Sequence, residues 1–203
     1  MCIAILKPKK ATIDVATLND CWDANSHGGG FAFAMKGKLN VFKSLEKDLF
    51  IDTLMESMAN HNANFLIHMR IATSGIKDMM INCHPFRIDN KNVFCHNGVI
   101  HNVNSDDDIS DTRYFNKDIL QQMKFNLKNK SHIKLIEGFI GNGNKLIFLN
   151  SKGEFTIANE KVGSWQNGVW FSNLNHSCDL EDDYQSWQNN LFTIKDYQKK
   201  MKL

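Results

Sequence analysis

The chain opens with Met1-Cys2-Ile3-Ala4-Ile5-Leu6, a cysteine followed at once by a short apolar run. An unbroken run of this length is typical of a buried strand. Because cysteine is small, we expect Met1 to be removed, which would leave a thiol and a free α-amine on residue 2. An α-amine has an ordinary pKa of about 7.7 to 8.0, so it can serve as the base for that thiol. Taken alone, Cys2 is more simply explained as a buried strand residue.

Short strands alternate with clustered helices along the chain, which favours an α+β layered domain. The predicted strands are 2–6, 31–35, 39–42, 65–72, 93–100, 145–150, 154–158 and 169–172, and the predicted helices are 15–24, 45–58, 111–123 and 131–139. The length of 203 residues suits one domain. We place this domain at residues 1–175 and expect residues 176–203 to form a C-terminal tail that packs on it.

Composition and charge exclude several classes of protein. The net charge is +2 without any dense Lys/Arg segment, so we expect no nucleic-acid partner. No stretch approaches the roughly 20 apolar residues of a membrane span, and the N-terminal order, apolar before basic, is the reverse of a secretory signal. We therefore expect a cytoplasmic protein without membrane association. The cysteine count is five, and no CxxC pair or common zinc spacing occurs, so no metal and no cofactor are expected.

The segment His68-Met69-Arg70-Ile71-Ala72-Thr73-Ser74-Gly75 places an arginine within an apolar strand. A guanidinium group in such a place is costly unless it meets an anion. Arginine suits two-pronged binding of a carboxylate, so Arg70 is a candidate for binding an acidic group of a ligand. Pairing with a structural Asp or Glu explains the same residue equally well.

Two later segments carry polar groups suited to chemistry. In Phe94-Cys95-His96-Asn97-Gly98-Val99-Ile100, the Asn97 amide and the Gly98 N–H are two neutral donors that could converge on a developing oxyanion. Alone, Asn-Gly is more typical of a hairpin turn. The segment Ser110-Asp111-Thr112 is, alone, typical of a helix N-cap.

Together, and in this order, these motifs resemble the class II glutamine amidotransferases of the N-terminal-nucleophile hydrolase superfamily. The matching segments are Met1-Cys2, Asn25 through Gly30, His68 to Thr73, Asn82-Cys83-His84-Pro85-Phe86, His96-Asn97-Gly98 and Ser110-Asp111-Thr112. The resemblance covers residues 2–115 well and residues 140–175 more loosely. It implies a four-layer αββα sandwich of two antiparallel sheets, an N-terminal-nucleophile hydrolase fold.

The resemblance implies that Cys2 attacks the side-chain amide of glutamine and forms a thioester, which water hydrolyses to glutamate. Asn97 and Gly98 would form the oxyanion hole. Many family members have Trp and His where this chain has Ile71 and Ser74, which places a standard ammonia channel in doubt. The segment after residue 175 is too short for an acceptor domain, so the ammonia would be released or passed to a separate partner synthase.

The resemblance also implies the binding residues. Arg70 would hold the α-carboxylate of the substrate and Asp111 its α-ammonium, while Thr73 and His84 would line the pocket. Two alternatives stay open. The chain could be a γ-glutamyl amidohydrolase that acts on a larger compound, or a non-catalytic binding module on the same fold.

Overall fold

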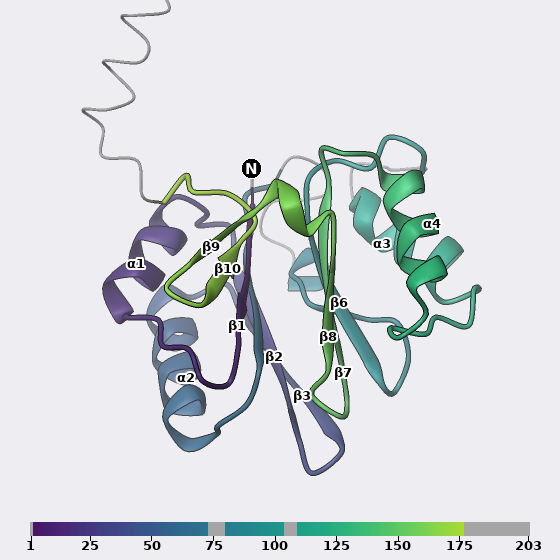
Figure 1. Ribbon diagram of the computed structural model, residues 1–203. Coiled ribbons are helices and arrows are strands. Elements are labelled where there is room, and N and C mark those ends of the chain that lie inside the picture. The colour runs from purple at the N-terminus through teal and green to yellow at the C-terminus, as the bar shows by residue number, and fades with distance from the viewer. Residues whose placement is uncertain (1, 73–79, 104–108, 177–203) are drawn as a thin grey trace, which may run out of the picture.

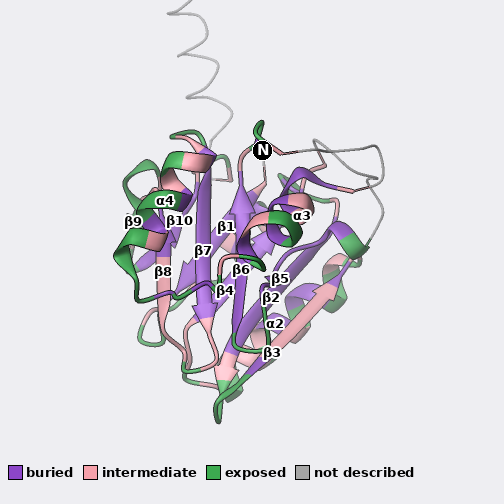
Figure 2. Ribbon diagram, turned by 90° about the vertical axis from the view of Figure 1, so that its right-hand side faces the viewer, coloured by how far each residue is buried: buried purple, intermediate pink, exposed green. Residues whose placement is uncertain are grey.

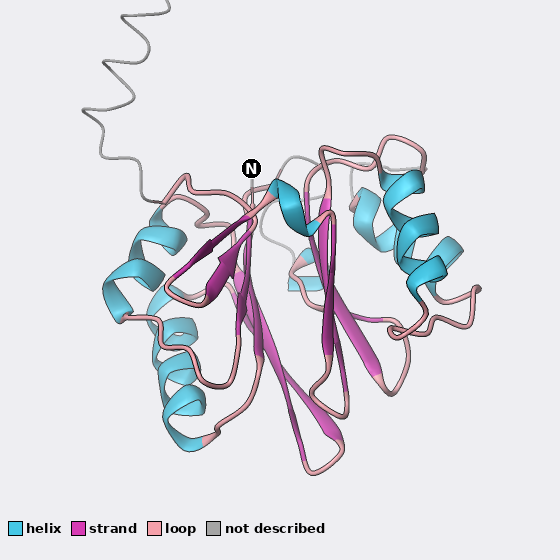
Figure 3. Cartoon of the chain, viewed as in Figure 1, coloured by secondary structure: helices cyan, strands magenta, loops and turns pink. Residues whose placement is uncertain are grey.

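The computed structural model describes residues 2–72, 80–103 and 109–176. Two antiparallel sheets lie face to face at its centre, and helices cover both outer faces (Figures 1 and 3). The first sheet has the order β3 (Lys38–Ser44), β2 (Gly29–Met35), β4 (Phe65–Met69), β1 (Ile3–Lys7), β10 (Val169–Phe171) and β9 (Ser164–Gln166). The second has the order β5 (Phe86–Arg87), β6 (Asn92–Asn97), β7 (Lys145–Asn150) and β8 (Phe155–Ala158).

Helices α1 (Val15–Asp23) and α2 (Lys47–Asn60) cover the first sheet, while α3 (Asp111–Phe115) and α4 (Lys130–Ile140) cover the second (Figure 1). The chain therefore forms the four-layer αββα sandwich predicted from its motifs. Within the described residues, none of the helices combines the length and apolarity needed to cross a bilayer.

Three apolar layers hold the four structural layers together, because successive residues of a strand point to opposite faces. In β1, Ile3 and Ile5 pack toward α1 and α2, whereas Ala4 and Leu6 pack toward the second sheet. The third layer joins the second sheet to α3 and α4. Figure 2 shows the buried residues concentrated in the strands and the exposed ones on the outer surfaces of the helices.

Local sequence explains where the longer helices begin. The Asp14 side chain accepts a hydrogen bond of 2.7 Å from the Thr17 N–H, which caps the first turn of α1. Asn129 caps α4 in the same way, by accepting 2.9 Å from the Ser131 N–H. The apolar residues of both helices then recur at helical spacing and face the neighbouring sheet.

Some predicted boundaries were wrong. The helix predicted over 111–123 is α3, five residues long, continued by a π-helical turn over Asn116–Leu120. The strands predicted over 65–72 and 93–100 end at Met69 and Asn97. The sequence pattern also missed the short strands β5 and β9. Of the predicted tail, residues 177–203 lie outside the described part of the chain.

Candidate active site

The candidate site lies at one end of the seam between the sheets, where β1 begins and β4, β6 and β10 end. In the antiparallel register, Ile3 pairs with Met69 and Ile5 pairs with Phe171. Cys2 therefore lies at the same end of the first sheet as Arg70 and Ser172. All three share the side of the sheet that faces β6, because alternation gives Cys2 the parity of Ala4, which packs between the sheets.

The Cys2 thiol is partly exposed and is held by the backbone of Ile71. Its Sγ donates to the Ile71 carbonyl at 3.3 Å, and the Ile71 N–H donates to Sγ at 3.4 Å. Burial raises the pKa of the Cys2 thiol, although the Ile71 hydrogen bond and the charge of Arg70 act to lower the pKa. A thiol with a raised pKa needs a base before it can attack a substrate. Both contacts involve the backbone of residue 71, so they do not depend on which side chain stands at this position.

Asn97 is fully buried and is tied to the first sheet by Ser172. The Asn97 Nδ2 donates to Ser172 Oγ at 2.6 Å, and the Ala4 N–H donates to the same oxygen at 2.9 Å. The Ser172 N–H in turn donates to the Ala4 carbonyl at 2.9 Å. Ser172 thus connects the amide of Asn97 to the strand that follows Cys2. An amide NH₂ has two N–H bonds, so the bond to Ser172 engages one of them.

Gly98 leaves β6 with a φ of 141°, a conformation that only glycine adopts readily. The β6–β7 register pairs Asn97 with Lys145, so Asn144 lies opposite Gly98. An added Cβ at residue 98 would overlap the Asn144 side chain. The chain runs on from here toward α3, and the hairpin-turn alternative for Asn97-Gly98 is wrong.

Asp111, the first residue of α3, holds the segment that follows Gly98. Its Oδ2 accepts 2.6 Å from the Ile100 N–H, and its Oδ1 accepts 2.7 Å from the Thr112 N–H. Ser110 precedes α3, but its side chain makes no capping hydrogen bond. The carboxylate of Asp111 is buried and kept in one direction by these two backbone donors.

Arg70 is buried directly after β4. Its N–H donates to the Gly28 carbonyl at 2.7 Å, and its carbonyl accepts 2.8 Å from the His27 N–H. These two bonds fix the backbone of Arg70 beside the Gly-rich segment that precedes β2. Arg70 therefore brings a buried cation to the end of the seam at which Cys2 lies.

His84 lies deeper between the sheets, with its ring centroid 4.0 Å from that of His68. Burial holds the pKa of His84 well below its ordinary value and lowers the pKa of His68 to about 3, so both rings are neutral near pH 7. Among the described residues, no three His, Cys, Asp or Glu side chains are arranged to hold a metal ion. Thr73, the remaining predicted binding residue, lies outside the described ranges.

Sequence reasoning missed two residues of this site. Ser172 ends a predicted strand at an inward-facing position, so strict alternation from Trp170 could have marked it as a buried polar group. Asn144 lies in the turn Gly141-Asn142-Gly143-Asn144, where polar residues are expected for reasons of turn formation. No local signal distinguished Asn144 from its neighbours.

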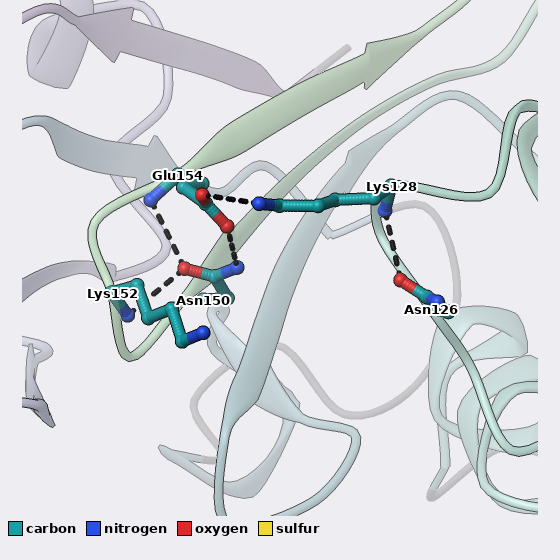
Figure 4. Close-up of polar contacts among 5 residues, drawn as sticks. All are labelled: Asn126, Lys128, Asn150, Lys152 and Glu154. Atoms are coloured by element: carbon teal, nitrogen blue, oxygen red, sulfur yellow. Dashed lines mark hydrogen bonds and ion pairs between the residues drawn. The ribbon is translucent and has the colours of Figure 1, made fainter.

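Grooves lie at the opposite end of the second sheet, near the β7–β8 turn. One, of about 570 Å³, runs between α4 and β8, and one of about 230 Å³ adjoins it. Lys128 and Glu154 line both grooves and pair at 2.8 Å, and Asn150 donates to Glu154 at 2.9 Å (Figure 4). In the register of β6 and β7, Asn150 pairs with Asn92, five residues from Asn97. This end is therefore distant from the candidate site.

No family model and no curated protein matches the chain. Among solved structures, the glutamine phosphoribosylpyrophosphate amidotransferase from B. subtilis, complexed with ADP and GMP, matches with a TM-score of 0.53 and 15% sequence identity. The match covers 84% of this chain and 41% of that chain, so this chain spans less than half of that enzyme's length. At this identity the likeness establishes the fold alone: the chain shares the layered αββα architecture of that structure, the N-terminal-nucleophile hydrolase fold.

Proposed function

We propose that this chain hydrolyses the side-chain amide of glutamine to glutamate and ammonia through a thioester on Cys2. The observation that carries the proposal is the hydrogen bond from Asn97 to Ser172. It holds a buried carboxamide NH₂ at the end of the seam where the nucleophile strand begins. A cysteine and a fixed amide donor at one end of a seam are what acyl transfer requires.

The reaction begins with the removal of Met1, which frees the α-amine of Cys2. The amine, acting through a water, takes the thiol proton, which it must do because burial raises the pKa of the thiol. The sulfur then bonds to the carboxamide carbon of glutamine. The C–N bond breaks as the amine returns its proton to the departing ammonia. Water finally attacks the thioester, which releases glutamate and restores the thiol.

The negative oxygen of the tetrahedral intermediate would be bound by Asn97 and Gly98. The second N–H of the Asn97 amide and the backbone N–H of Gly98 are neutral donors, and neutral donors need no counter-charge when buried. The bond from Ser172 fixes the direction of the amide before substrate arrives. Such preorganisation supports the transition state without a reorganisation cost during the reaction.

The α-carbon of glutamine carries both charges, so its pocket needs a fixed cation and a fixed anion. Arg70 would bind the α-carboxylate and Asp111 the α-ammonium. Thr73 and His84 would form parts of the pocket wall. The ammonia would be released or passed to a separate acceptor synthase.

The test is intact-mass spectrometry after incubation with a diazo-ketone analogue of glutamine, with Cys2→Ala as the matched control. We expect a mass lacking Met1, plus one adduct that maps to Cys2 and is absent from the control. Excess glutamine should slow its formation. In parallel, glutamate and ammonia should form in equal amounts from glutamine when no partner protein is added.

The outcomes separate the alternatives. A protein that has lost Met1 but forms neither adduct nor glutamate would overturn the proposal. If it instead cleaves γ-glutamyl amides with larger leaving groups, the substrate is a larger γ-glutamyl compound. If it binds glutamine without hydrolysis and Cys2→Ala binds equally well, the chain is a binding module.

A further inference from the structure

We infer that His96 and Asn144 are positioning residues that, through Thr112, hold the proposed oxyanion segment and the proposed ammonium-binding carboxylate in a fixed relation. The inference rests on the proposed function and extends it to residues that do not contact the substrate. It starts from an alternation in β6. Asn97 faces the first sheet, so its neighbour His96 faces α3 and α4.

The His96 ring makes a hydrogen bond at each nitrogen. Its Nδ1 lies 2.7 Å from Thr112 Oγ1, and its Nε2 lies 2.7 Å from Asn144 Oδ1. All three side chains are at least 95% buried. Water therefore does not compete for these bonds, and the donors and acceptors must match one another.

The direction of each bond follows from the Asn144 amide. Its Nδ2 donates to the Ile140 carbonyl at 2.5 Å, which leaves Oδ1 facing His96 as an acceptor. His96 must then carry its proton on Nε2. A neutral imidazole has only one N–H, so Nδ1 accepts from the Thr112 hydroxyl. The geometry thus assigns His96 the neutral Nε2–H tautomer.

A doubly protonated His96 would redirect the Thr112 hydroxyl. In this structure the Thr112 hydroxyl also lies 3.2 Å from Asp111 Oδ1, as a longer second contact beside the 2.7 Å contact with His96. With Nδ1–H donating to Thr112 Oγ1, the hydroxyl proton would serve Asp111 Oδ1 alone. Burial lowers the pKa of His96, although the charge of Asp111 and the bond to Asn144 act to raise the pKa. With the neutral ring, the Thr112 N–H donates to Asp111 Oδ1 at 2.7 Å, and His96 adds no positive charge beside the proposed ammonium site.

The other end of the chain of bonds reaches Gly98. Asn144 lies so close to the Cα of Gly98 that no Cβ would fit between them. Its carbonyl is held in turn by the Asn159 side chain, which donates at 2.7 Å. Since Asp111 also accepts from the Ile100 N–H, the segment 98–100 is fixed at both of its ends. One buried chain of contacts therefore connects the proposed oxyanion donor to the proposed ammonium binder.

The groups around His96 come from several elements. Its carbonyl lies 2.9 Å from His68 Nε2, the His84 ring centroid lies 6.5 Å away, and the charge of Lys145 lowers its pKa. Burial also lowers the pKa of His68 and of His84, so these neighbouring rings are neutral near pH 7.

The first test is independent of catalysis. The full chain, labelled with ¹⁵N in its histidine rings, should show His96 at pH 7 as a neutral Nε2–H imidazole, with the resonance assigned by its loss in His96→Gln. Asn144→Ala should remove the hydrogen bond at His96 Nε2 and so shift the Nε2 resonance. A wild-type His96 found as the Nδ1–H tautomer, or as an imidazolium, would overturn the inference. This measurement decides the tautomer even if the protein hydrolyses no glutamine.

The second test uses kinetics with glutamine. Asn144→Asp retains an acceptor but adds a negative charge, which favours the doubly protonated ring, so KM should rise about tenfold with a smaller change in kcat. Asn144→Ala removes the support behind Gly98, so kcat should fall about tenfold. His132→Gln is the matched control: His132 is a half-buried histidine of α4 that accepts from the Asn126 N–H, outside this chain of bonds, so both constants should stay unchanged.

The outcomes separate this inference from the proposed function. If the wild type hydrolyses glutamine and folded variants with unchanged melting temperature keep wild-type kcat and KM, the positioning role is refuted. If the wild type is inactive toward glutamine, the proposed function fails, and the ring-nitrogen spectra still support or refute the assigned tautomer. In an active enzyme, His96→Gln and Asn144→Ala should be non-additive, because they interrupt one chain of bonds.

Discussion

Replacing Ser172 by alanine removes one oxygen that two buried N–H groups share. The Ala4 N–H and the Asn97 amide donate to it at 2.9 and 2.6 Å. A buried donor that loses its partner costs about 1–3 kcal/mol. Two such donors give about 2–6 kcal/mol, and the small volume lost with the hydroxyl lets neighbours relax little. We expect Ser172→Ala to lower the free energy of unfolding by about 2–4 kcal/mol, which is the lower half of that range.

The assay is urea unfolding followed by circular dichroism, with Ser151→Ala as the matched control. The Ser151 side chain lies in the β7–β8 turn and makes no hydrogen bond with any residue that the structure describes, so its loss should stay within about 0.5 kcal/mol. In the glutamine assay, Ser172→Ala should reduce kcat more than it raises KM, because the Asn97 amide loses its fixed direction. A Ser172→Ala shift no larger than that of the control would refute the reasoning.

Three further predictions follow from the site. Gly98→Ala forces a φ of 141° on alanine, whose Cβ would overlap the Asn144 side chain. The melting temperature of the variant should fall by several degrees, a loss of about 1–3 kcal/mol. An unchanged melting curve would contradict the close contact between residues 98 and 144. Asn97→Ala should lower kcat for glutamine by roughly 10²–10³-fold, and unchanged turnover in stopped assays would remove Asn97 from the oxyanion hole. His68 has a pKa of about 3 in the folded protein, below its ordinary 6.5, so the unfolded chain binds a proton more readily. The free energy of unfolding should therefore be full above pH 6.5 and fall below it by up to about 1.4 kcal/mol per pH unit. Urea midpoints that stay constant from pH 7 to 5 would show that burial does not keep the ring neutral.

Alternation and helical spacing predicted most elements of this fold, because each pattern is local. Strand β7 was predicted with its observed bounds, and α1 to within one residue. The five residues of α3 could not be predicted, because the chain changes to a π-helical turn where Asn116 donates to the Arg87 carbonyl at 2.9 Å. That contact joins residues 29 positions apart, which no local period records.

The candidate site likewise combines residues that local motifs predict with residues that only the fold brings together. Cys2 and Asn97 could be named from their motifs, and the structure places both at one end of the intersheet seam. Their connection could not be named, because it passes through Ser172, 75 residues from Asn97 in the sequence. Likewise, His96 was part of a recognisable motif, but its partner Asn144 is 48 residues away. The motifs predicted which residues could take part in chemistry, whereas the residues that orient their side chains are brought there by the three-dimensional packing.

The position of β1 between β4 and β10 has a consequence for synthesis of the protein. The strand that follows Cys2 is synthesised well before residues 169–171, yet these residues form one of its two neighbours. Until that neighbour emerges, the Ala4 N–H has no Ser172 to bond with, and β1 presents an open edge. One edge of β1 therefore stays unpaired until residues 169–171 have been made. The Asn97 amide, the proposed oxyanion donor, thus stays without the Ser172 oxygen that fixes its direction until nearly all of the described chain has been made.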